Sequence, residues 1–246
     1  MPLLILFFHV NAHYAVGASL ICVIVASSTG AAAYIREGYA NLRIAMILVA
    51  VAVAGGVAGA LISGRLAPEM ITVTFGAFLV VCGVLSWQHR REIVQTAPSD
   101  PLVVHLSMEG SYPSTGGWQP YKVYHVICAL GAMVFAGILA GLLGIGAGVV
   151  NVLVMDRIMQ LPYKVSSTTS NFMTGITAAG GAGIHLKEGF ISPSLVMPVM
   201  LGVLLGASGG ARILPAAKSQ SLRVLFSAFV FIMAVEMVYR GSVGRL

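Results

Sequence analysis

Residues 43–62 read RIAMILVAVAVAGGVAGALI, a run in which Arg43, at its start, is the only charged side chain. About 20 mostly apolar residues are what an α-helix needs to cross the hydrocarbon core of a bilayer. Gly55 and Gly59 lie four positions apart in this run, so they share a helix face and allow a neighbouring helix to approach closely. The stretch therefore predicts a membrane-spanning helix with a tight packing seam.

The same kind of window recurs along the chain. Windows of sufficient length and apolarity cover 13–33, 68–88, 122–143, 165–186, 193–214 and 220–239, while 1–8 and 149–159 are shorter apolar pieces. Hydrophobic residues make up 58% of the 246 residues and charged residues only 9%, far from the roughly one-quarter charged residues of a soluble domain. We predict an all-α polytopic protein, surrounded by lipid in the bacterial inner (plasma) membrane and crossing it several times.

The charged and metal-binding residue types exclude other classes. The net charge is +6, but the 14 Lys and Arg residues are scattered singly between apolar windows, which favours a topology signal over a nucleic-acid surface. Cys22, Cys82 and Cys128 each stand alone inside a window, which favours buried packing residues over metal ligands. We expect no nucleic-acid partner, no metal and no cofactor.

An internal repeat divides the chain. At an offset of 151 residues, Ser19 matches Ser170 and Gly30 matches Gly181, and the loop at 36–39, REGY, matches KEGF at 187–190. A repeat of this length indicates two copies of one helical unit. We assign residues 1–88 to the first transmembrane repeat, 89–121 to a polar linker and 122–246 to the second repeat.

The second repeat contains a segment that the first one lacks. It begins with a helix at 122–143 and the glycine-rich turn GIGAG at 144–148, whose counterparts would precede Met1. We therefore expect the chain to start about 25 residues late relative to a complete two-unit protein, with 1–8 as the remnant of its first short helix. The alternative is a first unit that is naturally shorter.

The distribution of basic residues bears on topology. If the short pieces dip in and return, the repeats run parallel and the basic residues divide eight against six; if they cross, the second repeat is inverted and ten lie on the linker side against four. Because basic residues concentrate on the cytoplasmic side, the inverted arrangement is favoured. In both arrangements the linker is predicted to be cytoplasmic.

Small-residue seams are predicted at two further places, Gly137-xxx-Gly141 and Gly202-xxx-Gly206-xxx-Gly210. Such seams serve contacts within and between chains alike, so they leave the oligomeric state open.

The strongest functional signal lies between 144 and 177, where glycines interrupt an apolar run and hydroxyl residues follow on one helical face. A helix broken inside the membrane presents free N–H groups and a dipole that attract an anion. The alternative is that Ser and Thr bond back to their own helix carbonyls and only permit close packing. We predict a substrate site formed by Gly144, Gly146, Gly148, Asn151, Ser166, Ser170, Asn171, Thr174 and the repeat partner Ser19.

Ionisable residues inside the apolar windows are few. His185 and Lys187 close the polar helix and could meet an anion at its mouth, although an interfacial position also explains them. Glu236 lies four residues before Arg240, which favours an end-of-helix pair over a proton carrier.

Two motifs resemble a known family. The run GLLGIGAG at 141–148 followed by KVSSTTSNF at 164–172 is similar to the second-half signature of the TauE/SafE sulfite exporter family, and MPLLI at 1–5 with AVGASL at 15–20 resembles its first half. The resemblance covers nearly the whole chain. It implies a membrane transporter for sulfite, sulfonates or related organic anions, and the family name implies that the direction is export.

Two other functions remain as alternatives. A passive anion channel would use the same glycine break and hydroxyl face, and flux saturation with counterflow would separate it from a carrier. An intramembrane serine protease is suggested by Ser19 on one helix and His185 on another. The repeat argues against the protease, because Ser19 has a twin in Ser170 and a single catalytic dyad needs no duplicated scaffold.

Overall fold

The computed structural model describes residues 1–36, 40–87, 108, 110–114, 117–213 and 235–236. The first half comprises α1 (Pro2–Leu6), α2 (Ala12–Arg36), α3 (Leu42–Ser63) and α4 (Pro68–Trp87). A hairpin of β1 (Gly110–Ser114) and β2 (Gly117–Tyr121) follows. The second half comprises α6 (Val126–Leu143), α7 (Gly148–Leu153), the π-helical turn η1 (Val154–Ile158), α8 (Tyr163–Lys187) and α9 (Pro193–Ile213).

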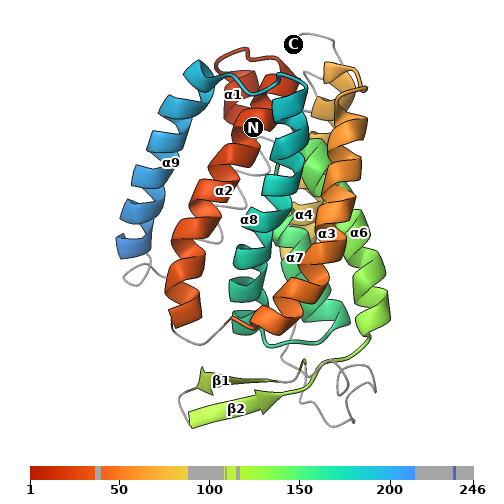
Figure 1. The fold of residues 1–246 in the computed structure, drawn as a ribbon, viewed down its shortest axis with the longest axis vertical. Coiled ribbons are helices and arrows are strands. Elements are labelled where there is room, and N and C mark those ends of the chain that lie inside the picture. The colour runs from red at the N-terminus through yellow and green to blue at the C-terminus, as the bar shows by residue number, and fades with distance from the viewer. Residues whose placement is uncertain (37–39, 88–107, 109, 115–116, 214–234, 237–246) are drawn as a thin grey trace.

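The long helices form a bundle whose axes follow the long dimension of the molecule, with α8 inside it (Figure 1). α8 packs on α2 and on α3, α3 packs on α6, and α9 lies against α2. Two buried hydrophobic clusters fill the bundle, one including Ile44, Met133 and Met173, the other Leu4, Leu20 and Phe75. The α-helical class predicted from the sequence is thus confirmed for the described bundle.

Three helices in the described part of the chain are long and apolar enough to cross a membrane: Ala12–Gly30, Leu42–Ser63 and Val126–Leu143. The described apolar parts of α4 and α9, Pro68–Val81 and Pro193–Ala207, are shorter. The window at 165–186 does form a helix, α8, but it does not reach the apolarity of a span because its first half is rich in Ser and Thr. The window at 220–239 lies outside the described residues except for 235–236.

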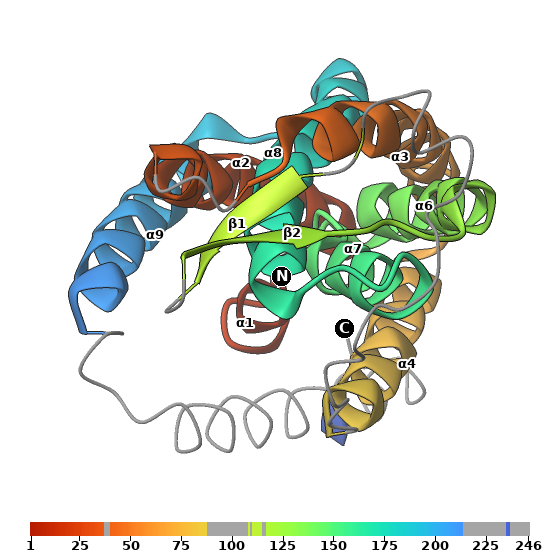
Figure 2. The ribbon, with the colours of Figure 1, turned by 90° about the horizontal axis from the view of Figure 1, so that it is seen from below.

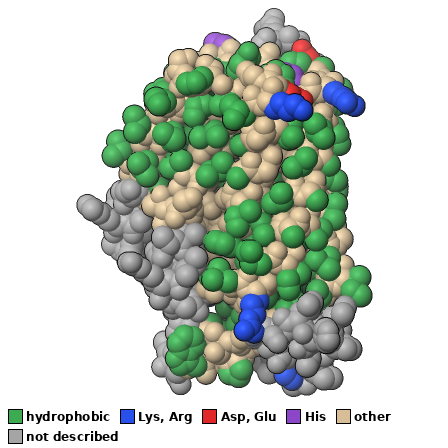
Figure 3. Space-filling view, in the orientation of Figure 1, with side chains coloured by type: hydrophobic (Ala, Val, Ile, Leu, Met, Phe, Trp, Pro, Cys, Tyr) green, Lys and Arg blue, Asp and Glu red, His purple; other side chains and the backbone are tan. Residues whose placement is uncertain are grey.

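On the face shown in Figure 3, the outer wall of the described bundle carries many hydrophobic side chains, and charged side chains lie near its two ends. Large apolar side chains face outward, among them Met46, Phe135 and Leu205. So much exposed apolar surface fits a lipid environment. The expectation of buried cysteines holds for Cys22 and is wrong for Cys128, which belongs to this outer wall; the side chain of Cys82 lies outside the described ones.

The glycines predicted to form seams in α3 and in α6 are in close contact, and the structure shows that they face each other. A Cβ atom at Gly55, Gly59, Gly137 or Gly141 would come within 2.5 Å of a backbone oxygen of the facing helix, so these helices touch through their backbones. At the predicted seam of α9, a Cβ atom at Gly202 or Gly206 would meet no atom of the described residues within 4 Å. This seam therefore makes no helix contact within the described part of the chain, and its role stays a prediction.

The polar linker is not wholly irregular, which corrects the all-α expectation. β1 and β2 pair antiparallel, from Gly110 opposite Tyr121 to Ser114 opposite Gly117, and the hairpin lies across one end of the bundle (Figures 1 and 2). Met108, just before the hairpin, and Tyr121, the last residue of β2, are both buried. The amide Nδ2 of Asn41, at the start of α3, donates to the Tyr121 hydroxyl at 2.7 Å and to the Met108 carbonyl at 3.2 Å.

Candidate functional site

A glycine-rich turn separates α6 from α7. Backbone φ is 69° at Gly144, 67° at Gly146 and 56° at Ala147, values that strain any residue with a side chain. Space adds a second restriction, since a Cβ atom at Gly144 would lie 2.9 Å from the carbonyl oxygen of Val16 on α2. The break predicted at 144–148 is confirmed, and its first residue has to be glycine.

The turn is inserted between α2 and α8. A Cβ atom at Gly146 would lie 2.7 Å from both Val23 on α2 and the Thr174 methyl group on α8, and one at Gly148 would lie 3.0 Å from the Thr174 hydroxyl. Hence the three glycines of the predicted site contact two long helices, and α7 begins deep inside the bundle.

Asn151 is carried into the interior by the first turn of α7. Its side chain is 0% exposed, and neither its amide nitrogen nor its amide oxygen has a hydrogen-bond partner among the described residues. A buried amide without partners is costly, and such groups in native proteins call for an explanation such as function or an unseen ligand. Asn151 therefore offers two hydrogen-bond donors and an acceptor to whatever enters the site.

The hydroxyl face of α8 lies along α7. Ser170 donates to the Gly148 carbonyl at 2.7 Å, and Thr174 donates to the Ser170 carbonyl at 2.7 Å. Ser166 makes a long contact of 3.5 Å with the Leu161 carbonyl. Thr177, one turn beyond Thr174 on the same face, is buried and its hydroxyl has no partner. Ser170 thus ties α7 to α8, and Thr174 bonds within its own helix.

The antiparallel course of α7 and α8 sets what Asn151 faces. Gly148 lies against Thr174 near the middle of α8, and Leu161 reaches Ser166 near its start. Asn151 is one turn beyond Gly148 on the same face of α7. Its side chain is therefore brought toward the stretch of α8 that runs from Ser166 to Ser170.

Asn171 is used differently from the other predicted site residues. Its amide Nδ2 donates to the Ser27 carbonyl at 3.3 Å, and the Ser27 hydroxyl donates to the Asn171 carbonyl. These bonds join α8 to α2. Asn171 follows Ser170 by one residue and so points about 100° away from it around the helix, toward α2 and not toward α7.

Ser19 lies on the α2 face that borders the turn. Val16 and Val23 both contact the turn glycines, and Ser19 shares their face by helical spacing. Its hydroxyl donates to the Ala15 carbonyl at 2.7 Å. The structure thus brings Ser19 alongside the glycine turn, and its hydroxyl donates its hydrogen bond within α2.

The sequence profile of the family described as Sulfite exporter TauE/SafE matches residues 1–237 of this chain. The chain belongs to the TauE/SafE sulfite exporter family. Among similar proteins is the probable membrane transporter protein YunE of Bacillus subtilis (strain 168), 22% identical over 238 residues, which cover 96% of this chain and 84% of YunE. The probable membrane transporter protein YdhB of the same strain is 24% identical over 212 residues, which cover 86% of this chain and 79% of YdhB. No solved structure matches the chain.

Family membership agrees with the apolar bundle, and together they establish a membrane transporter. The geometry does not form the serine protease dyad considered above. In this TauE/SafE chain the Ser19 hydroxyl donates to Ala15, and neither ring nitrogen of His185 has a hydrogen-bond partner. The hydrogen bond through which a histidine activates a serine is therefore absent between these two described residues.

No role was predicted for Ser27, and Thr177, the last hydroxyl residue of the stretch from 144 to 177, was not among the predicted site residues. A signal for Ser27 was present, because Ser27, Ser28 and Thr29 interrupt an otherwise apolar window. Sequence alone does not separate Ser27, which bonds across to α8, from Ser28 and Thr29, which donate to carbonyls of their own helix. The distinction depends on which side of α2 faces a neighbour.

Proposed function

We propose that this chain is a secondary transporter that exports small oxyanions, with sulfite and sulfonates as the substrate class. The observation that carries the proposal is the unpartnered, fully buried amide of Asn151 beside a glycine break in the middle of the bundle. The family name supports this substrate class and direction. The proposed site comprises the residues predicted from the sequence, centred on Asn151 and Ser170.

The chemistry suits transient binding. Asn151 supplies N–H donors that fit the oxygens of a sulfite or sulfonate group. The site residues themselves carry no charge, so no fixed positive charge would trap an anion. A neutral hydrogen-bonding site binds weakly enough to release its cargo, which a carrier has to do in every cycle.

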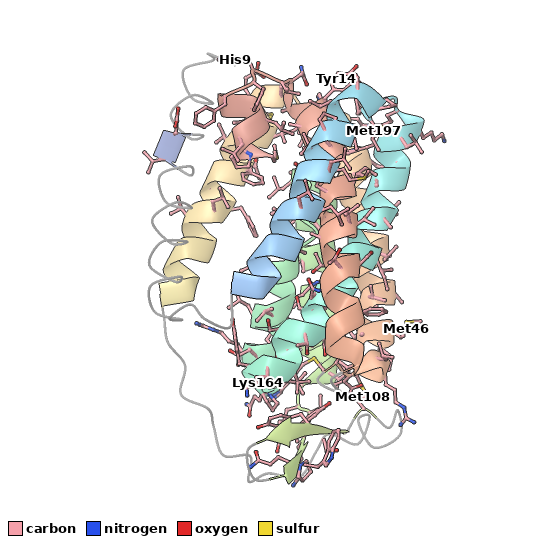
Figure 4. The ribbon with its side chains drawn as sticks, turned by 90° about the vertical axis from the view of Figure 1, so that its left-hand side faces the viewer. His9, Tyr14, Met46, Met108, Lys164 and Met197 are labelled. Atoms are coloured by element: carbon pink, nitrogen blue, oxygen red, sulfur yellow. The ribbon has the colours of Figure 1, made fainter. Side chains whose placement is uncertain are left out.

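A two-repeat, inverted architecture would supply the conformational change, as it does in many carriers. We infer that residues 1–88 and 122–246 are the repeats and that 89–121 is a cytoplasmic linker in the inner membrane. The courses of equivalent helices support the inference: α2 and α8 are antiparallel, since Gly17 lies against Phe190 and Ser27 against Asn171. α3 and α9 also run in opposite directions (Figures 1 and 4).

Burial favours a carrier over a channel. Asn151 is closed off from solvent, as expected for a binding site exposed to one side at a time, whereas a conducting pore would hold its polar groups in water. Counterflow distinguishes the two, because only a carrier loaded with unlabelled anion accelerates uptake of the labelled one.

Efflux of sulfite and of a panel of small sulfonates from proteoliposomes tests the proposal. The variant is Asn151→Leu, which keeps the side-chain volume and removes the amide. Because replacing an unpaired buried amide by an apolar group of similar shape is close to neutral for stability, we expect an intact protein with most of its flux lost. Ser28→Ala is the matched control, since Ser28 is exposed and bonds within α2.

Saturable flux that falls in Asn151→Leu and persists in Ser28→Ala supports the proposed site. Wild-type flux that never saturates, or equal flux in wild type and Asn151→Leu, would overturn it.

A further inference from the structure

A second group of unpartnered polar atoms lies at the other end of α8, away from the hairpin. The buried side-chain atoms without a hydrogen-bond partner include Nδ1 of His13, Oγ of Ser63 and both ring nitrogens of His185. These residues come from three helices, at the start of α2 and at the ends of α3 and α8. Tyr14, the neighbour of His13, marks this end of the bundle in Figure 4, opposite Lys164 and Met108.

His185 is at the centre of the group. Its side chain is 0% exposed, although an imidazole always has a lone pair or an N–H to satisfy on each nitrogen. On one side His185 is flanked by Phe190, and the two rings form an edge-to-face pair with a centroid distance of 6.2 Å. An aromatic wall supplies neither a donor nor an acceptor in the ring plane of the histidine.

His13 packs against the same aromatic ring. Its imidazole stacks on Phe190 with a centroid distance of 4.8 Å and an interplanar angle of 17°. Nδ1 of His13 is buried and has no hydrogen-bond partner among the described residues. Two imidazoles thus share Phe190, each with an unpartnered ring nitrogen.

Ser63 is the third residue of the group, and the packing register of α3 on α8 sets its height in the bundle. Gly56 lies against Thr177, and Gly64 lies against the carboxylate of Glu188. Between these two points, parallel helices bring Ser63 to the level of His185. Ser63 is fully buried, and its hydroxyl has no hydrogen-bond partner among the described residues.

The charged and titratable groups of the described residues at this end of the bundle include the amino group of Met1, His9 before α2 and Glu69 in the first turn of α4. α2 contributes His13 and Tyr14, and the end of α8 contributes Lys187 and Glu188, of which Glu188 interacts electrostatically with His13. Arg65 follows the end of α3. The described parts of α6, α7 and α9 bring no titratable group to this end of the bundle.

We propose that His13, Ser63 and His185 form a proton-binding site, and that the bound proton is the ion coupled to anion transport. One proton added from water turns an imidazole into an imidazolium, whose second N–H is satisfied by the free nitrogen of the other histidine or by Ser63. Glu188 balances part of the added charge. The coupling rests on the proposed transport function, whereas the proton site itself does not.

Charge movement after a proton-concentration jump, recorded on a solid-supported membrane with proteoliposomes and no anion substrate, tests the site. We expect a transient current in the wild type, because a proton that enters a buried site crosses part of the membrane field. His185→Gln should lose most of this current. Ser63→Ala keeps both imidazoles and should retain the current with a shifted pH midpoint. His125→Asn, at the exposed far end of α6, is the control and should match the wild type.

The same vesicles are then loaded with sulfite and given a pH gradient. A gradient-driven flux, of either sign, that disappears in His185→Gln supports the coupling. Absence of the transient in the wild type, or an undiminished transient in folded His185→Gln, would overturn the proton site. Saturable sulfite flux that ignores the gradient would overturn the coupling and leave the transporter standing.

Discussion

Ser27 on α2 and Asn171 on α8 exchange hydrogen bonds across the helix interface. The Ser27 hydroxyl donates to the Asn171 carbonyl, and the Asn171 amide donates to the Ser27 carbonyl at 3.3 Å. Gly175, one turn along α8, allows this approach, because a Cβ atom there would lie 2.6 Å from the Ser27 hydroxyl oxygen. The pair fastens two helices that occupy equivalent places in the proposed repeats.

Breaking this pair should loosen the α2–α8 interface. We expect Ser27→Ala and Asn171→Leu each to lower the free energy of unfolding by about 1 kcal/mol, as interhelical hydrogen bonds in membranes do. The double variant should lose less than the sum, which reversible unfolding in mixed micelles would measure. Ser28→Ala, with a hydroxyl that bonds only within α2, should have no such coupling to Asn171→Leu; strictly additive effects of Ser27 and Asn171 would contradict the pairing.

The glycine seam predicts a sharp contrast within a single helix. Gly141→Ala would force a Cβ atom against the Gly56 carbonyl, whereas Gly131→Ala, also on α6, meets nothing within 4 Å. We expect the first to destabilise by about 1–3 kcal/mol and the second to be neutral or stabilising by up to about 1 kcal/mol, since alanine favours helix over glycine. Thermal unfolding in detergent compares them, and equal melting temperatures would refute the direct backbone contact.

The turn before α7 separates backbone strain from crowding. Gly144 and Gly189 both have positive φ, 69° and 77°, but only Gly144 has a backbone oxygen within 3 Å of a Cβ position. Alanine at Gly189 should cost about 1–2 kcal/mol for the left-handed conformation alone. Alanine at Gly144 should cost more and should reduce sulfite efflux, because the turn positions α7. A smaller effect at Gly144 than at Gly189 would be inconsistent with insertion of the turn against α2.

Docking of the β-hairpin should depend on pH. Burial raises the pKa of Tyr121 above its ordinary value of 10.0, while the hydrogen bond from Asn41 opposes the shift. A raised pKa of this hydroxyl means that the stability from burying it is fully present below pH 10.0 and is lost as pH rises through the folded-state value. We expect cleavage of the hairpin by an alkaline-active protease to increase above that point.

Tyr121→Phe should remove this alkaline step, because it has no hydroxyl to ionise. Tyr112→Phe serves as the matched control, since the Tyr112 hydroxyl donates to Gln119 at the exposed surface. A step that survives in Tyr121→Phe would assign it to another group.

The sequence by itself determined the membrane class, the family, the glycine break and the glycines of the close seam in both α3 and α6. These features depend on composition over about 20 residues, or on residues such as Gly144 whose conformation few other amino acids adopt. It also placed Asn151 in the site, because a polar residue directly after a glycine break in an apolar run has few structural reasons to be there.

Only the tertiary structure decided which polar side chains have hydrogen-bond partners among the described residues and which have none. Ser19 and Thr174 bond within their own helices, Ser170 and Asn171 bond to different neighbours, and Asn151 remains unpaired. The contact of the hairpin with Asn41 and the exposure of Cys128 likewise depend on which segments become neighbours. Helical spacing fixes the face on which a residue lies, but the partner on that face is set by packing between segments that are far apart in the chain.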